Sequence, residues 1–458
     1  MASVPCVRRS PPLLRLVGVV TTLCGASWAF ARRPSLLRPS SRGNAGNAGN
    51  ALTPQQLTGR LKAAETSNHL LFLVEQYENV LNEYHVRAAL TRLAQSNETT
   101  TLSGDPGFRK LLSRTSELMT TFRSQALATV LWSLAKVEYD PGEPFLRSVI
   151  DASLPQLKQS KPQEMVNSLW ACARFGYQPG DAFLEALVDT SSSTMDDFEP
   201  MDVANLLWSF ARLGFHPGNH FLDAVVARSL EIVQSFAPVD IANILWAFAK
   251  LKVDEGERLR PLLQQAEEQL DSFEPAKLAS LLWSCNKLQL DPSLVLLRAL
   301  PCRSNRELTE LRPRGLSYVL WVYGLLGHNP GTAFLQRVME KLSRTVPAFD
   351  YCGAQGLSGI LWSCARFNYD PGEEQVTALL SSAQQHLLQF TPAQLTRLLW
   401  ACAKLQRRPR EEFLQAWLEQ ARKHLPDFEA EELLLCHRSF NQLNFTEGEV
   451  AGLRMDWN

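Results

Sequence analysis

One stretch decides the fold of this 458-residue chain: FEPMDVANLLWSFARLGFHP, at residues 198–217. Its Leu-Trp pair returns at intervals of 37 to 41 residues. The eight tryptophans in this register are Trp132, Trp170, Trp208, Trp246, Trp283, Trp321, Trp362 and Trp400. A fixed period of this length indicates a repeat architecture in which each copy is one supersecondary unit.

Prolines bracket the Trp in most copies. A proline stands eight residues before the Trp in six copies and nine residues after it in seven. Proline is tolerated at the first position of a helix and cannot continue one. The pair therefore predicts a helix of about fifteen residues that begins at the first proline and ends before the second. This helix is named A, and its positions are numbered from the Trp, which is position 0.

A second apolar segment follows each turn, and in five copies it opens on a Phe-Leu pair such as Phe183-Leu184 or Phe221-Leu222. This segment predicts a second helix, B. A lone helical hairpin cannot bury both of its faces, so the copies must stack on one another. We therefore predict an all-α fold, a right-handed α-solenoid of about eight 38-residue helix-turn-helix repeats with degenerate capping repeats.

The flanks keep the rhythm of helix A but lack the Trp. Residues 85–94 carry Thr91 at position 0, and residues 433–443 carry Arg438 there. Terminal repeats face water on one side and are expected to diverge, so both segments are interpreted as caps. The predicted organisation is a disordered targeting presequence at 1–50, an N-terminal degenerate cap at 51–121, the repeats at 122–427 and a C-terminal degenerate cap at 428–458.

Composition excludes several classes of protein. Apolar residues make up 45% of the chain and charged residues 20%, which indicates a globular rather than a disordered protein. The nine cysteines contain no CxxC pair. Four of them stand two residues after a Trp, which favours small core side chains over disulfides or metal ligands, namely Cys172, Cys285, Cys364 and Cys402. We expect neither a metal nor a cofactor.

Charge divides the chain into two unlike parts. Residues 1–50 hold seven Arg and no acid, whereas the rest holds 39 basic and 47 acidic residues, a balance of −8.

The apolar run at 16–23 follows Arg8 and Arg9 and precedes small residues at Ser27 and Ala29, as in a signal peptide. The run is too short to span a bilayer comfortably, so we expect no membrane span in the mature chain.

The segment after this run, to about residue 50, is rich in Arg and Ser, like an organellar transit peptide. A signal peptide followed by a transit peptide resembles the bipartite presequence of algae with complex plastids. In those presequences an aromatic residue, here Phe30, begins the transit peptide. The resemblance implies a plastid protein, and a mitochondrial presequence is the alternative.

A helical wheel of helix A shows an arc that the core does not require to be apolar and that is therefore available to contact a ligand. Apolar or small residues fill positions −5, −2, −1, +2, +3 and +5, so positions −7, −6, −3, +1 and +4 remain. Position +4 is basic in seven of eight copies, namely Lys136, Arg174, Arg212, Lys250, Lys287, Arg366 and Lys404. A cation that recurs in each repeat suits contacts with RNA phosphates.

Positions −3 and −6 vary among hydrogen-bonding groups, as the reading of different bases requires. The candidates at position −3 are Thr129, Asn167, Asn205, Asn243, Ser280, Tyr318 and Arg397. The candidates at position −6 are Glu164, Asp202, Asp240, Lys277 and Gln394.

Simpler interpretations of these positions stay open. The Trp column is expected to fill the core rather than to stack on bases. A cation in the last turn of a helix also suits the helix dipole, and Asn at −3 can hydrogen-bond the backbone of a neighbouring repeat. The chain contains no GxSxG, HExxH or P-loop motif, so we predict no catalytic residues and no enzyme.

The repeat at 198–217 resembles the octotricopeptide repeat, and it is similar to the leucine-rich repeats of the FAST kinase-like organellar RNA proteins. The resemblance covers about residues 65–445. It implies an organellar protein that binds single-stranded RNA in a sequence-selective way and controls the stability, processing or translation of transcripts, together with other RNA-processing or translation proteins. Many relatives end in a RAP domain, a small nuclease-like fold, which we do not expect here. The alternative function is a protein–protein interaction scaffold.

The presequence yields a first test. We expect residues 1–50, fused to a fluorescent reporter, to direct the reporter into the plastid of a complex-plastid alga, because an Arg-rich, acid-free segment follows a signal-like apolar run. A fusion in which Arg32 and Arg33 are replaced by Glu serves as the control and should lose plastid entry. Reporter that stays in the cytosol with the native sequence would contradict the prediction.

Overall fold

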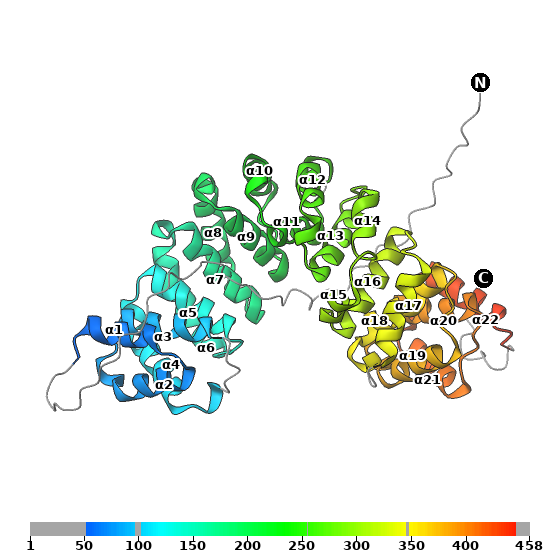
Figure 1. Cartoon of the computed structure of the whole chain (residues 1–458), viewed down its shortest axis with the longest axis horizontal. Coiled ribbons are helices and arrows are strands. Elements are labelled where there is room, and N and C mark those ends of the chain that lie inside the picture. Colours follow the sequence, from blue (N-terminus) through cyan, green and yellow to red (C-terminus); the bar gives the residue numbers. More distant parts are fainter. Residues whose placement is uncertain (1–51, 97–101, 254, 345–347, 446–458) are drawn as a thin grey trace, which may run out of the picture. The chain divides into compact units, whose positions relative to one another are not determined.

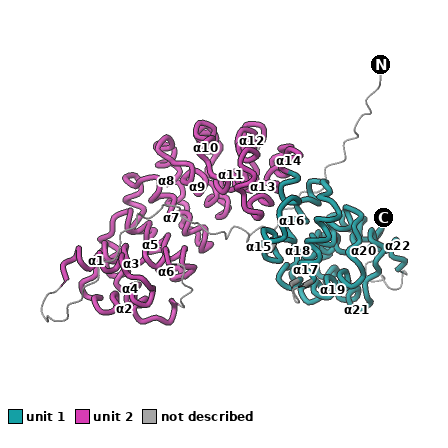
Figure 2. Tube along the Cα trace, viewed as in Figure 1, with its two compact units in different colours: residues 1–28, 297–458 teal, residues 29–296 magenta. Residues whose placement is uncertain are grey.

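The computed structural model describes residues 52–96, 102–253, 255–344 and 348–445 (Figure 1). The predicted presequence lies outside the described residues. Within them every regular element is a helix, which confirms the all-α fold class. The chain divides into two compact units between Leu296 and Leu297, and each is described by itself. The first along the described chain, up to Leu296, is magenta in Figure 2 (unit 2 in its key), and the second, from Leu297, is teal (unit 1).

The A helices pack on one another in chain order within each unit. In the first unit they are α1 (Pro54–Ala63), α3 (Glu83–Gln95), α5 (Ser124–Lys136), α7 (Pro162–Phe175), α9 (Pro200–Leu213), α11 (Pro238–Leu251) and α13 (Pro275–Lys287). In the second they are α16 (Pro313–Leu326), α18 (Gly353–Arg366), α20 (Pro392–Lys404) and α22 (Ala430–Gln442). This continuous packing of successive helices is the arrangement of a solenoid.

The B helices alternate with the A helices along the chain (Figure 1). They are α2 (Ser67–Gln76), α4 (Pro106–Leu118), α6 (Glu143–Ser153), α8 (Asp181–Ser193), α10 (Asn219–Glu231), α12 (Arg260–Glu268), α17 (Thr332–Arg344), α19 (Glu373–Gln385) and α21 (Glu411–Lys423).

Short 3₁₀ turns complete the chain. They are η1 (Glu78–Val80), η2 (Leu102–Gly104), η3 (Met119–Thr121), η4 (Leu154–Gln159), η5 (Met195–Asp197), η6 (Val233–Ser235), η7 (Glu257–Leu259), η8 (Leu270–Ser272), η9 (Ala348–Tyr351), η10 (Leu387–Gln389) and η11 (Leu425–Asp427). Several of them end just before a buried Phe that precedes the next A helix, as η5 does at Phe198 and η10 at Phe390.

Proline sets the start of helix A as predicted. The helices α7, α9, α11, α13, α16 and α20 each begin at the proline eight residues before the Trp. The residue before the proline is extended, with ψ between 145° at Glu274 and 160° at Glu199, because the proline ring disfavours the helical region there.

The end of helix A is a left-handed cap at position +6. This position has positive φ in all eight repeats, and five of the residues are not glycine: Glu138, Lys252, Gln289, Asn368 and Gln406. In seven repeats the following N–H bonds back to the carbonyl of position +2, as Phe215 does to Phe210 at 3.0 Å, which is the Schellman arrangement. Asn444 has the same conformation in the C-terminal cap, so α22 keeps the register with Arg438 at position 0.

The Trp column is part of the core, as predicted. Five of the eight tryptophans are between 4% and 9% exposed, and the other three are half-buried. Neighbouring indoles approach each other: the rings of Trp208 and Trp246 lie 6.5 Å apart. The four cysteines two residues after a Trp are free and buried, which confirms them as core side chains.

One repeat departs from the predicted hairpin. After Trp283, two short helices replace a single helix B, namely α14 (Leu294–Ala299) and α15 (Asn305–Glu310). Pro301 accounts for the break, because the residue before a proline avoids the helical region and α14 ends at Ala299. Among the described residues, no helix is both long and apolar enough to cross a membrane.

The burial of the Trp column yields a stability prediction. Trp208→Ala should lower the free energy of unfolding by about 3–5 kcal/mol, because it removes a large side chain that is 5% exposed. The loss should concentrate in the adjoining repeats, since each repeat contacts its neighbours. Hydrogen exchange, read by mass spectrometry, measures that distribution.

Phe72→Ala is the matched control, because it removes an aromatic side chain that is 62% exposed in the same unit. It should change stability by less than about 0.5 kcal/mol. Equal effects of the two substitutions would refute the structural role of the Trp column.

Candidate nucleic-acid interface

Three positions of helix A lie together on its surface: −7, −3 and +4, which fall within about 40° of one another at 100° per residue. These residues of the A helices are named the open ridge. Sequence reasoning left position −7 out of the candidate list although the wheel placed it on the free arc. It holds exposed polar side chains at Gln125, Gln163 and Arg314.

The predicted basic column lies on this ridge. Its side chains are half-buried at Lys136, Arg174, Arg212 and Lys250 and exposed at Lys287, Arg366 and Lys404. Cations of consecutive repeats are neighbours: burial lowers the pKa of Lys136, and the positive charge of Arg174 lowers it further. At this pair, two like charges of consecutive repeats lie close enough to repel each other.

These cations also touch the end of the preceding A helix. Arg174 forms an ion pair of 3.3 Å with Glu138, which is the cap residue of α5. Arg366 reaches Gly327, the cap residue of α16, and its guanidinium lies 5.4 Å from the centre of the Trp362 ring. A cation at a helix C-terminus is stabilised by the helix dipole, so this simpler interpretation of the column has direct support.

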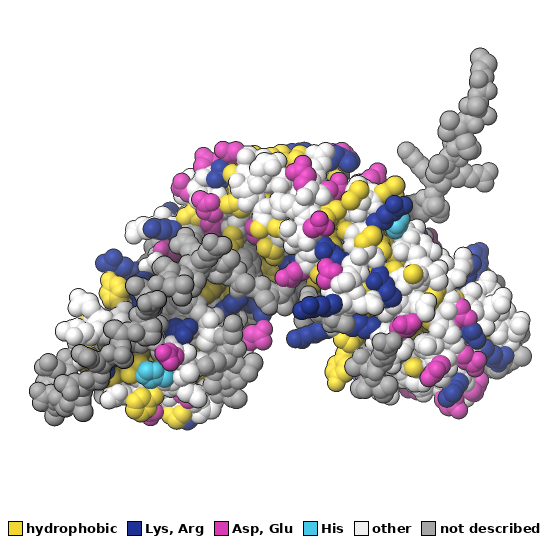
Figure 3. All heavy atoms as spheres, viewed as in Figure 1, with side chains coloured by type: hydrophobic (Ala, Val, Ile, Leu, Met, Phe, Trp, Pro, Cys, Tyr) yellow, Lys and Arg dark blue, Asp and Glu magenta, His cyan; other side chains and the backbone are white. Residues whose placement is uncertain are grey.

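Many exposed acids of the first unit lie on the B helices, although others, such as Glu138 and Glu199, lie at the ends of A helices. Those on the B helices include Asp181, Glu185 and Asp189 on α8, Asp223 and Glu231 on α10, and Glu268 on α12. Figure 3 shows acidic side chains along the edge formed by these helices. The negative balance of the chain is therefore carried to a large extent by side chains away from the basic column.

The position −3 candidates divide into two groups. Thr129, Asn167, Asn205, Tyr318 and Arg397 are half-buried. Asn243 and Ser280 are buried, and the Asn243 Oδ1 accepts a hydrogen bond of 2.9 Å from the Lys277 Nζ of the next repeat. Asn243 thus contacts the neighbouring repeat, as the simpler interpretation of position −3 expects, but through the Lys277 side chain rather than the backbone.

The position −6 candidates lie between stacked helices, and this corrects the helical wheel. Asp202, Asp240, Lys277 and Gln394 are only 5–8% exposed, and Glu164 is half-buried. Each of the following contacts reaches the previous A helix: Ser124 Oγ donates to Glu164 at 2.7 Å, Lys277 donates to Asn243, and Gln394 donates to Gln355 at 2.9 Å. The wheel considers one helix alone and so does not account for the neighbour that covers this side.

Arg397 shows the same arrangement at the C-terminal cap. Burial lowers its pKa to about 10, while the carboxylate of Glu432, at position −6 of α22, acts in the opposite direction. The guanidinium lies 5.9 Å from the centre of the Trp362 ring on the preceding repeat. The side chain at position −3 of one repeat, Arg397, thus interacts with the side chain at position −6 of the next, Glu432, as Asn243 does with Lys277.

In two of the buried acids, burial disfavours the ionised carboxylate. Burial raises the pKa of Asp202 and of Asp240 to about 6, from a usual value of 3.8. Lys277 opposes the shift at Asp240, whose Oδ2 accepts from the Ala237 N–H at 3.3 Å while Oδ1 is buried without a partner. Ionisation of these carboxyls therefore opposes folding.

The described residues offer a row of cations and amides but no group of three or more metal-ligating side chains. Burial raises the pKa of Cys172, Cys285, Cys364 and Cys402 to about 12, so these thiols stay protonated and unreactive at neutral pH. The arrangement is suited to holding an extended anionic chain by its phosphates.

The raised acid pKa values yield a pH prediction. A carboxyl whose pKa is 3.8 unfolded and about 6 folded contributes stability below pH 4 that is lost as the pH rises through 6. Asp240→Asn should therefore gain about 1–3 kcal/mol of unfolding free energy at pH 7.5 relative to the wild type. At pH 4 the gain should vanish.

Urea unfolding of both proteins at the two pH values measures the difference. Asp196→Asn, which neutralises an exposed acid of the same unit, is the control and should show the same difference at both pH values. A destabilised Asp240→Asn at pH 7.5 would mean that the carboxylate's contacts outweigh its burial.

Comparison with known proteins completes the description of this surface. The family model described as the Tbc2 translation factor N-terminal domain matches residues 94–289 and 296–446. The comparison with curated proteins found no significant match. Among solved structures, the chain is similar to a chain of a homology model of the full-length AP-3 complex in an intermediate open conformation. The two are 13% identical in sequence, the match covers 85% of this chain and 76% of the other, and the TM-score is 0.35, too low to support an argument. Because the family model covers more than half of the chain, the protein belongs to the Tbc2 translation factor N-terminal domain family.

Proposed function

We propose that the protein binds single-stranded RNA along the open ridge and so controls the translation of an organellar transcript. The observation that carries this proposal is the basic column, with a cation at position +4 in seven of eight consecutive repeats. Repulsion between neighbours such as Lys136 and Arg174 is relieved when phosphates lie between them. Translation is favoured over transcript stability or processing because the chain belongs to a translation factor family.

Base reading is assigned to position −3 together with position −7. Side chains at −6 are engaged between helices, as Lys277 is with Asn243, so they contribute to selectivity through their neighbours. Asn205 is half-buried and Gln163 is exposed, and amides of this kind can bond the edges of bases. With one base for each repeat, the footprint is about eight nucleotides of single strand.

The protein acts in this proposal as a binding protein without chemistry of its own, inside a plastid or, as the alternative, a mitochondrion. The Arg-rich, acid-free residues 1–50 support an organellar address. Partners besides RNA are other proteins of organellar translation or RNA processing, which the acidic B helices could contact.

The proposal predicts a salt-dependent loss of binding when the column is neutralised. The quadruple change Arg174→Ala, Arg212→Ala, Lys250→Ala and Lys287→Ala should weaken binding to a randomised single-stranded RNA pool and lower the salt slope by about three, at about 0.7 for each phosphate contact. Filter-binding titrations of the full chain at 50 and 200 mM salt measure both quantities.

A matched control removes four cations from the B side of the same unit: Arg147, Lys158, Arg258 and Arg260, each to Ala. It changes net charge by the same amount and should leave the slope nearly unchanged. Failure of the wild type to enrich any RNA, together with specific capture of an organellar protein, would favour the scaffold function instead.

A further inference from the structure

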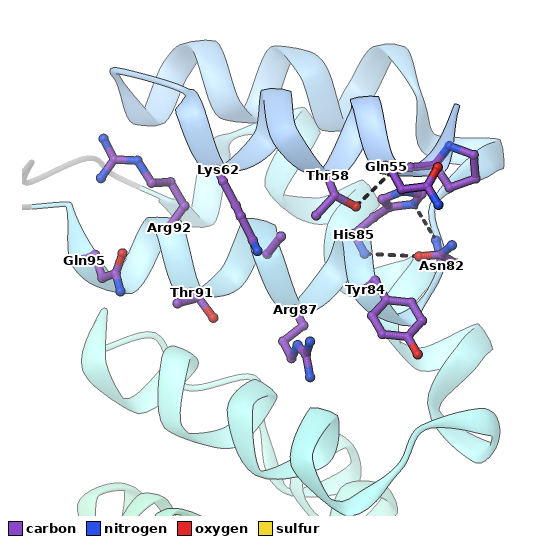
Figure 4. Close-up of a pocket in the computed structure, with 12 residues that line it drawn as sticks. Gln55, Thr58, Lys62, Asn82, Tyr84, His85, Arg87, Thr91, Arg92 and Gln95 are labelled. Atoms are coloured by element: carbon purple, nitrogen blue, oxygen red, sulfur yellow. Dashed lines mark hydrogen bonds between the residues drawn. The ribbon is translucent and has the colours of Figure 1, made fainter. Parts of the chain in front are cut away.

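The N-terminal cap contains a cavity of about 870 Å³ between α1 and α3 (Figure 4). Its volume lies in the range of about 300–1,000 Å³ that is usual for small-ligand sites. This cavity is named the cap pocket, and the side chains that matter for its chemistry are Lys62, Tyr84, Arg87, Thr91, Arg92 and Gln95.

The cap pocket exists because the cap lacks the Trp. Thr91 stands at position 0 of α3, where the eight repeats carry an indole that packs into the helix surface. Ala88, at position −3, is also small. Two small side chains at these positions leave a hollow in the A-helix surface where the repeats are filled.

The charge of the pocket is positive. Its lining includes the side chains of Lys62, Arg87 and Arg92 and no carboxylate. The guanidinium of Arg92 is held in place by a hydrogen bond of 2.8 Å from its Nε to the Ala64 carbonyl. Lys62 is exposed and extends from α1 toward α3 (Figure 4). An anion can therefore approach two cations that belong to different helices.

An aromatic ring lies at the other end of the lining. Tyr84 is 55% exposed, and the Arg87 guanidinium lies 5.6 Å from the centre of its ring. Arg87 also bonds Gln125 on α5, which orients it. A planar ring beside a planar cation is a surface on which a nucleobase stacks.

His85 takes no part in this chemistry. Its Nδ1 accepts from the Asn82 N–H at 3.1 Å, so the proton is on Nε2, which donates to the Pro54 carbonyl at 2.9 Å. The ring is 1% exposed and joins α3 to α1. His85 is therefore a structural link between the two helices rather than a group available to a ligand.

We propose that the cap pocket binds a short segment of a single strand, with a base on Tyr84 and backbone phosphates at Lys62 and Arg92. The proposal rests on the proposed function, because it extends the RNA path of the open ridge from α5 onto α3. Gln95 and Thr91 supply hydrogen-bonding groups to the sugar and base edges. A free mononucleotide has the same chemistry, and the experiment separates the two sources.

The test is photocrosslinking of the full chain to a randomised RNA pool that contains 4-thiouridine, followed by mass spectrometry of the crosslinked peptides. We expect a crosslink within residues 84–95 as well as crosslinks on the repeats. Tyr84→Ala should weaken RNA binding at least about fivefold, whereas Tyr84→Phe keeps the ring and should bind nearly normally. Thr91→Trp restores the repeat residue and should block the pocket without loss of thermal stability.

Arg109→Ala, which removes an exposed cation of α4 outside the lining, is the control for charge and should leave binding unchanged. Crosslinks confined to the repeats, with unchanged binding in Tyr84→Ala and Thr91→Trp, would overturn the cap pocket but leave the proposed function intact. Absence of RNA binding by the wild type would overturn both. In a second arm, AMP, GMP, CMP and UMP are titrated into the protein and followed by fluorescence. Saturation in the micromolar range that RNA does not compete away would identify a free nucleotide, rather than an RNA strand, as the ligand of the cap pocket.

Discussion

The fold of each unit depends on the packing of each A helix on the A helix that follows it in that unit. The contact is close because small residues lie within it. A Cβ at Gly324 would stand 2.5 Å from the Trp362 ring of the next repeat, and one at Gly359 would stand 3.0 Å from the Trp321 Cβ. The eight indoles fill what remains. A repeat cannot bury these surfaces alone, so the stack supplies its stability.

Much of the fold could be predicted because the determinants are local. Proline begins six A helices at the expected residue, and the left-handed cap recurs even where Lys252 or Glu138 replaces glycine. The Asp-Pro-Gly turns are local as well: the Asp140 carboxylate accepts from the Gly142 N–H at 2.9 Å. The break into α14 and α15 was missed, although Pro301 was its visible signal.

The candidate site was harder to predict, because it depends on neighbours that a single-helix wheel omits. Position +4 is predicted to be on the surface, and the structure has it exposed at three cations and half-buried at the other four. Position −6 was also placed there, yet Asp202, Asp240 and Lys277 are buried against the preceding helix. The polar variety at −6 is explained in part by pairing across repeats, as in Lys277 with Asn243. Buried pairs of this kind can specify which repeat stacks on which.

This division of labour limits how the protein could read a ligand. One side of helix A is committed to stacking, and the cations at +4 repeat with little variation, so they cannot distinguish sequences. In the proposed function, selectivity would then fall to positions −3 and −7, and to −3 alone in the four repeats where −7 is apolar. Where −3 is Gly359, Trp321 packs against it and no reading group remains. A reader of this kind would discriminate unevenly along its target, more strongly at a repeat with amides at both positions, such as Asn167 and Gln163, than at a repeat where packing between the helices occupies position −3.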